Sequence, residues 1–256
     1  MKHFIQNAAH EKIAVVVEGI ENQAPKGLVF ISHGMSGYKE HHLVRIPAEI
    51  CLEKGYIVVS YDARYSFGES DGSLDKGWLQ TYIDDLKTVI FWAQKQFFYQ
   101  EPFSLIGHSL GAGAAIDYAE KNPNKVLNLI SIAGFFSGHL LLKSYQENMP
   151  DLWKKWQQEG KIEKVCKERI SQKGFIPPSY ILNTLPYDFV ENAKNITAHT
   201  MLICAEKDKS STILNNKIFY DSLMSSKEMV ILKECNHFFS KEEQQKLLRK
   251  NLLGFI

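Results

Sequence analysis

One segment of the chain, FSLIGHSLGAG, holds a serine between two glycines in a Gly-x-Ser-x-Gly pattern, with Ser109 as the central residue. An apolar run, Phe103–Ile106, precedes the pattern, and a helix of small residues, Leu110–Glu120, is expected to follow it. A sharp turn from a strand to a helix would expose the serine hydroxyl, and the glycines would leave room for the tight backbone. We therefore predict that Ser109 is a nucleophile, in preference to an N-capping serine in an ordinary turn.

A serine hydroxyl is a weak nucleophile and needs a base within hydrogen-bonding reach. Of the nine histidines, His237 lies in the segment ECNHFF, just beyond the last predicted strand and before the last predicted helix. His108 neighbours the serine in sequence, but we expect its side chain to point elsewhere on the turn. The position of His237 at the same edge of the sheet makes it the predicted base.

A histidine base needs a carboxylate that orients it. Asp208 follows the predicted strand Thr200–Ala205 and precedes His237 in the chain. Glu206, two residues closer to the strand end, is its nearest rival, and Asp188 is a more distant one. With Asp208 as the acid, the residues occur in the order serine, acid, histidine, which is the order of one fold family.

The predicted strand Gly27–Ser32 ends in the segment HGMSG. A His-Gly pair at this point lets the backbone bend so that the next N–H faces the nucleophile. We predict that the N–H groups of Met35 and Leu110 form an oxyanion hole, since preorganised donors stabilise the negative charge of the transition state. His33 would then be structural and orient this loop.

A metal site formed by His33, His41 and His42 is the competing interpretation of these histidines. Their spacings of eight and one residues match no common ligand pattern. We therefore expect neither a metal nor another cofactor.

Short apolar strands alternate with helices along the chain, which predicts a parallel sheet with helices on both faces. In such sheets, chemistry takes place at the carboxyl ends of the strands, where each candidate residue above is expected. The predicted strands are Lys2–Gln6, Lys12–Gly19, Gly27–Ser32, Tyr56–Tyr61, Phe103–Ile106, Val126–Ala133, Thr200–Ala205 and Glu228–Leu232. The predicted helices are Leu43–Lys54, Trp78–Phe97, Leu110–Glu120, Thr212–Met224 and Lys241–Leu253.

The alternation breaks between about Ser137 and Ala198, where there is no sign of a buried strand. This segment contains an amphipathic stretch, Leu140–Gln158, a polar stretch, Glu159–Lys173, and three prolines. We predict a lid insertion at about 137–198, in preference to extra helices on the sheet edge, because it follows the carboxyl end of a strand. Its aromatic residues fit an apolar acyl pocket and the internal packing of a lid equally well.

The composition is that of an ordinary globular protein, with 256 residues, 45% apolar, and a formal net charge of +1. This near-neutral charge argues against nucleic-acid and membrane-surface partners. No apolar run approaches the roughly 18 residues of a membrane helix, and the N-terminus lacks the pattern of a secretory signal. The four cysteines form no Cys-x-x-Cys pair and are expected to be reduced, buried thiols. We expect a cytoplasmic single domain spanning residues 1–256, and a homodimer stays open.

Taken together, these motifs resemble the α/β-hydrolase superfamily over essentially the whole chain. The segment YDARYSFGESDG, starting at Tyr61, is similar to the D-x-R-G-x-G-x-S-x-G loop of small esterases and monoglyceride lipases. The subgroup that the chain resembles most is that of cinnamoyl/feruloyl-esterase-like and dienelactone-hydrolase-like enzymes. The resemblance implies a mostly parallel sheet of about eight strands, a lid insertion in the predicted place, and the three catalytic residues above.

Two departures from the family pattern are visible. Tyr65-Ser66 replaces the usual glycine and small residue in the loop after Asp62. After Asp208 the chain reads Lys209-Ser210-Ser211, where the family commonly has Val-Pro. The surroundings of the predicted acid are therefore unusual.

We predict a serine hydrolase that cleaves small-molecule carboxylic esters through an acyl-enzyme on Ser109. A thioesterase, an amidase or a peptidase is also compatible with the sequence, because a catalytic triad does not discriminate between leaving groups. A non-catalytic ligand-binding protein of the same fold and an acyltransferase are further alternatives. Covalent labelling of Ser109 by a fluorophosphonate probe would distinguish an enzyme from a non-catalytic ligand-binding protein.

Overall fold

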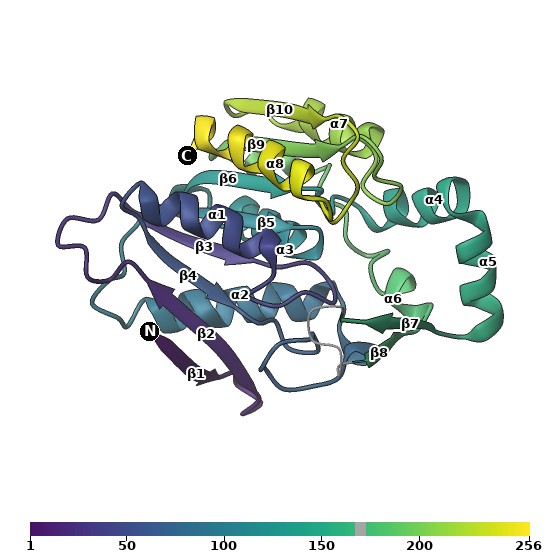
Figure 1. Ribbon diagram of the computed structural model, residues 1–256, viewed down its shortest axis with the longest axis horizontal. Coiled ribbons are helices and arrows are strands. Elements are labelled where there is room, and N and C mark those ends of the chain that lie inside the picture. The colour runs from purple at the N-terminus through teal and green to yellow at the C-terminus, as the bar shows by residue number, and fades with distance from the viewer. Residues whose placement is uncertain (167–172) are drawn as a thin grey trace.

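The computed structural model describes residues 1–166 and 173–256, and at its centre lies an eight-stranded sheet (Figure 1). Its strands lie in the order β1-β2-β4-β3-β5-β6-β9-β10. The pairs β1–β2 and β2–β4 are antiparallel, and the other neighbouring pairs in this sheet are parallel. The predicted mostly parallel sheet of eight strands is thus confirmed. The strands are β1 (Lys2–Gln6), β2 (Lys12–Glu18), β3 (Leu28–Ser32), β4 (Ile57–Tyr61), β5 (Phe103–His108), β6 (Val126–Ile132), β9 (His199–Ala205) and β10 (Lys227–Leu232).

Helices cover both faces of this sheet (Figure 1). One face carries α1 (His42–Glu53) and α8 (Glu242–Phe255), and the other carries α2 (Leu79–Ala93), α3 (Leu110–Lys121) and α7 (Ile213–Ser222). The two faces form two separate clusters of buried apolar side chains. Every residue of the central strands β3, β4 and β5 is buried, because a parallel strand covered on both faces meets no water.

Two elements near the candidate nucleophile differ from their predicted bounds. β5 continues past Ile106 to His108, because Gly107 and His108 still pair with β6. The helix α2 ends at Ala93, before the predicted Phe97, because the chain turns there and buries the side chain of Phe98. Short 3-10 turns complete the frame, η1 (Leu74–Lys76), η2 (Pro123–Lys125) and η3 (Ala193–Asn195).

The segment between β6 and β9 lies beyond the carboxyl ends of the parallel strands, at the right in Figure 1. We call residues 137–166 and 173–198 the connecting segment. It contains α4 (Gly138–Asn148), α5 (Pro150–Glu159), β7 (Ile162–Val165), β8 (Lys173–Ile176) and α6 (Ser179–Leu182). β7 and β8 form a separate antiparallel pair. The predicted role of this segment as a lid stays a prediction.

The predicted amphipathic stretch Leu140–Gln158 is two helices rather than one. The break falls at Met149, because Pro150 disfavours the helical conformation in the residue before it. β7 has no signature of a buried strand because two of its four residues are exposed. Part of the predicted polar stretch Glu159–Lys173 lies outside the described residues.

All four cysteines are free and buried. Within the described ranges, every helix is too short or too polar to cross a membrane.

Candidate active site

Ser109 occupies the turn between β5 and α3, with φ 53° and ψ −117°. Its N–H donates to the carbonyl of Ile132, and the two flanking glycines are required by close backbone contacts. A Cβ on Gly107 would lie 2.4 Å from the backbone N of Ala112, and one on Gly111 would lie 2.4 Å from the Ser32 carbonyl oxygen. A side chain at either glycine would therefore push the turn away from the sheet. The unusual backbone conformation holds the serine hydroxyl at the sheet edge.

Asp208 follows β9 and faces the predicted base. Its Oδ2 lies 2.5 Å from Nδ1 of His237. Its Oδ1 accepts hydrogen bonds of 2.9 Å from the N–H groups of Ser210 and Ser211 and from the Ser210 hydroxyl. The segment that departs from the family pattern thus supplies three donors to the carboxylate.

These contacts decide the charge of Asp208. Burial by itself would raise the pKa of its carboxyl, but the facing His237 and the backbone donors hold that pKa below its ordinary value. Asp208 is therefore ionised at neutral pH and holds the imidazole through Nδ1, so that Nε2 is the ring nitrogen without a contact to this carboxylate.

The two rival carboxylates lie elsewhere. Oε2 of Glu206 accepts a hydrogen bond from the N–H of Glu234. Asp188 accepts from the N–H of Val190 and from the Ser137 hydroxyl. Asp208 is the carboxylate that the structure brings to the histidine.

His108 is not part of the sequence-predicted triad, yet its side chain contacts the loop that carries His237. Its Nε2 lies 3.0 Å from the His237 carbonyl oxygen, and the two rings lie 4.9 Å apart. Burial places the pKa of His108 well below its ordinary value, so this ring is neutral and does not repel a protonated His237. His42 holds the next residue of the loop, with its Nε2 2.7 Å from the Phe238 carbonyl oxygen. The residues in these contacts are far apart in the chain, so no local sequence signal marks them.

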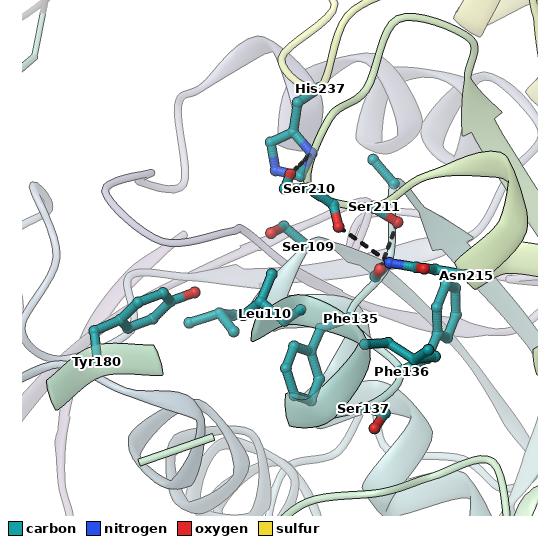
Figure 2. A pocket seen from close by; sticks show the side chains of 14 residues that line it. Ser109, Leu110, Phe135, Phe136, Ser137, Tyr180, Ser210, Ser211, Asn215 and His237 are labelled. Carbon is teal, nitrogen blue, oxygen red and sulfur yellow. Dashed lines mark hydrogen bonds between the residues drawn. The ribbon is translucent and has the colours of Figure 1, made fainter. Parts of the chain in front are cut away.

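Ser109 and His237 line one pocket between the sheet edge and the connecting segment (Figure 2). Its volume is about 330 Å³, part of it open to solvent. The predicted triad residues are thus close together, with Asp208 behind His237. Apolar side chains, including those of Phe135 and Phe136, form much of the wall. Polar groups that the sequence did not indicate also line it, and these are Ser137, Ser210, Ser211 and Asn215.

The predicted oxyanion donors belong to two segments next to the nucleophile, the start of α3 and the HGMSG loop. Leu110 is the first residue of α3, so its N–H belongs to the helix end that lacks intrahelical acceptors. Met35 follows Gly34, whose close approach to the nucleophile shows in a 3.0 Å distance between a Cβ built on Gly34 and the Cβ of Ser109. The HGMSG loop therefore passes beside the side chain of Ser109 at Gly34. The assignment of the Met35 and Leu110 N–H groups as donors stays a prediction.

The three histidines weighed as metal ligands each have another partner. His33 accepts from the Ala63 N–H through Nε2, and its Nδ1 lies 2.7 Å from the Gly34 carbonyl oxygen. His41 caps α1 by accepting from the N–H of Leu43. In the part of the chain that the structure describes, no three His, Cys, Asp or Glu side chains are grouped so that they could hold a metal ion.

Comparison with known proteins places this site in a wider context. The Hydrolase_4 family model, described as serine aminopeptidase S33, matches residues 23–176, more than half of the chain. A search of the curated proteins finds no match.

Several solved structures share the fold. Est1E from Butyrivibrio proteoclasticus with bound ferulic acid has a TM-score of 0.78 at 16% identity, over 99% of this chain and 97% of its own. Mouse alpha/beta hydrolase domain-containing protein 10 has a TM-score of 0.74 at 18% identity, over 100% and 98%. The esterase domain of a Rhodothermus marinus protein has a TM-score of 0.70 at 15% identity, over 100% and 96%.

Proposed function

Because the chain belongs to the Hydrolase_4 family and has the α/β-hydrolase fold, we propose that it is a serine hydrolase of carboxylic esters. The observation that carries the proposal is the 2.5 Å contact between Asp208 and His237 beside a serine in a strained strand-to-helix turn. Such a constellation activates a hydroxyl for acyl transfer.

In the first half of the reaction, Nε2 of His237 removes the proton of Ser109 as its Oγ attacks the acyl carbon. The carbonyl oxygen becomes an oxyanion, which accepts hydrogen bonds from the N–H groups of Met35 and Leu110. Asp208 stabilises the imidazolium without taking up its proton. The imidazolium then protonates the leaving alcohol as the ester bond breaks, and an acyl-enzyme remains.

The second half of the reaction repeats these steps with water. His237 takes a proton from a water molecule, whose oxygen attacks the acyl carbon. The second oxyanion collapses, Ser109 recovers its proton from His237, and the carboxylic acid leaves. This chemistry uses only side-chain and backbone groups of the chain.

The choice of an ester over a peptide is supported by the charge of the cavity around Ser109. The family description, serine aminopeptidase, favours a peptidase as the second candidate. An aminopeptidase needs an anionic group that holds the free amino terminus of its substrate. Among the described residues lining this cavity there is no Asp or Glu, and its wall is largely apolar. An uncharged acyl group fits such a wall better than an ammonium does.

Replacement of the nucleophile tests the proposal. Ser109→Ala should lower the rate of p-nitrophenyl acetate hydrolysis by about 10⁶-fold and abolish labelling by a fluorophosphonate probe. The matched control is Ser222→Ala, on α7, which should keep both activities. Full activity of the Ser109 variant would contradict the assignment.

A substrate panel separates the alternatives. We expect faster turnover of p-nitrophenyl esters than of aminoacyl p-nitroanilides with a free amino group. The opposite preference would favour the peptidase. An added alcohol that captures the acyl group faster than water would indicate a transferase.

A further inference from the structure

A second, larger cavity is lined by residues that neighbour the candidate active site in the chain. Its volume is about 1130 Å³, part of it open to solvent. Ser36, next to the predicted oxyanion donor, and Phe238, next to the predicted base, both line it. A smaller cavity lined by Gly34 and His108 shares Ser36 and Phe238 with it. The loops that carry the predicted oxyanion donor and the predicted base therefore both contribute to the wall of this second cavity.

β7 contributes a lysine to the wall of the second cavity. Alternate residues of a strand share a face, so Lys164 lies on the same face as Ile162, which packs against the buried core. Glu163 lies on the opposite face and pairs with Lys173 across to β8. Lys164 thus occupies an inward position where an apolar residue would be expected.

Lys164 is partly buried, and no described carboxylate neutralises its charge. Within residues 1–166 and 173–256, no carboxylate forms an ion pair with it, and burial lowers the pKa of its ammonium. The described wall of the second cavity contains no Asp or Glu. An ammonium withdrawn from water without a partner is costly, and an incoming anion would offset that cost.

The other groups in this wall indicate what kind of anion fits. His41 and His42 are neutral, because burial lowers the pKa of both rings and brings that of His41 to about 3. Lys164 is therefore the positive charge of the described wall, and an anionic group of a ligand would pair with it. The side chains of Phe238 and Val165 offer an apolar surface to the body of the ligand.

We propose that the second cavity binds a carboxylate-bearing part of the substrate and that Lys164 selects for its negative charge. The substrate is then an ester with a carboxylate several bonds away from the reacting carbonyl, joined by an apolar or aromatic body. This inference rests on the proposed ester hydrolysis and adds the substrate class to it.

Two pairs of matched esters test the inference. The first pair is 3-carboxyphenyl acetate and phenyl acetate, which differ by a charge on the leaving group. The second pair is monophenyl glutarate and phenyl pentanoate, which differ by a charge on the acyl group. The measured quantity is the ratio of kcat/KM for the charged ester to that for the neutral ester of each pair. The intrinsic difference in reactivity between the two esters is the same for every variant, so a change in this ratio reports a change in recognition of the charge.

In one of the two pairs, Lys164→Met should lower the ratio by about 10- to 100-fold, the loss expected for a hydrogen bond to a charged group. Lys164→Glu should lower it further, and Lys164→Arg should keep most of it. The control is Lys161→Met, because Lys161 lies nearby over the Phe175 ring and does not line the cavity. Its ratio should equal that of the wild type.

An unchanged ratio in Lys164→Met for both pairs would overturn the inference, even if both esters of a pair react more slowly. Such a result would leave ester hydrolysis itself intact. Failure of the proposed function looks different, because the wild-type protein would then hydrolyse none of the four esters and take up no fluorophosphonate at Ser109.

Discussion

The two sides of Ser109 are built by different means. On the sheet side, Asp208 and His108 are buried, and hydrogen bonds tie both to the loop of His237. On the other side, helices α4 and α5 of the connecting segment bury few residues, namely Gly138, Ser144 and Trp156. The predicted chemistry thus rests on many directional contacts, and the opposite wall of the cavity rests on apolar packing.

That packing centres on a small group of aromatic rings. Trp156 of α5 is 1% exposed, donates from Nε1 to the Ile176 carbonyl, and lies against the rings of Tyr145 and Tyr180. Tyr180 in turn lines the cavity around Ser109, facing it in Figure 2. Apolar packing tolerates changes of shape better than a hydrogen-bond network does. We therefore expect the wall formed by the connecting segment to tolerate substitutions that leave the contacts of Asp208 and His237 unchanged.

The largest expected effect in this comparison comes from the orienting carboxylate. Asp208→Asn keeps the size of the side chain but loses the charge that stabilises the imidazolium. We expect kcat on p-nitrophenyl acetate to fall by about 10⁴-fold. Glu206→Gln, at the end of the same strand, is the control and should stay close to wild type. A small loss in Asp208→Asn together with a large loss in Glu206→Gln would reverse the assignment of the acid.

Asp208→Asn should also change how the free energy of unfolding depends on pH. The pKa of the Asp208 carboxyl is lowered in the folded state from its ordinary value of 3.8. Its ionised form therefore stabilises the fold fully above about pH 4, and this contribution is lost as pH falls through the lower folded-state pKa. The difference in unfolding free energy between wild type and Asp208→Asn should shrink below about pH 4, as denaturant titrations at several pH values would measure.

On the other side of Ser109, the aromatic packing predicts a selective effect. Trp156→Ala should lower the unfolding free energy by about 3–5 kcal/mol. It should also lower kcat/KM for esters with bulky acyl groups by at least about 10-fold relative to acetate, through a displaced Tyr180. Trp92→Ala, on α2 and beside His3, is the control for destabilisation alone. Equal losses on acetate and bulky esters would mean that this wall supports the chemistry as well.

The smallest expected effect concerns the serine that departs from the family pattern. Ser210→Ala removes the hydroxyl donor to Asp208 and keeps both backbone donors. We expect kcat/KM to fall by about 2- to 10-fold, the worth of one hydrogen bond. Ser210→Thr retains a hydroxyl and should recover most of the rate. If the threonine variant is no better than the alanine variant, the hydroxyl has no part in positioning Asp208.

The local patterns of the sequence predict much of this molecule. Continuous apolar runs predict β3, β4 and β5, because strands covered on both faces need apolar residues at every position. Errors occur where local and tertiary preferences compete, as at the end of α2, where burial of Phe98 outweighs helical periodicity. The antiparallel pair β7–β8 was missed because its half-exposed residues carry little hydrophobic signal.

The sequence by itself determined the order of strands and helices and the Gly-x-Ser-x-Gly turn, because backbone constraints of this kind act between residues close together in the chain. The packing of the fold determines which carboxylate faces His237 and how His108 and His42 hold its loop. It also brings Lys164 into the wall of the second cavity. These contacts join residues far apart in sequence, and their energies depend on burial and on the distances between atoms. Burial and distance are set only when the folded sheet brings the carboxyl ends of its strands together.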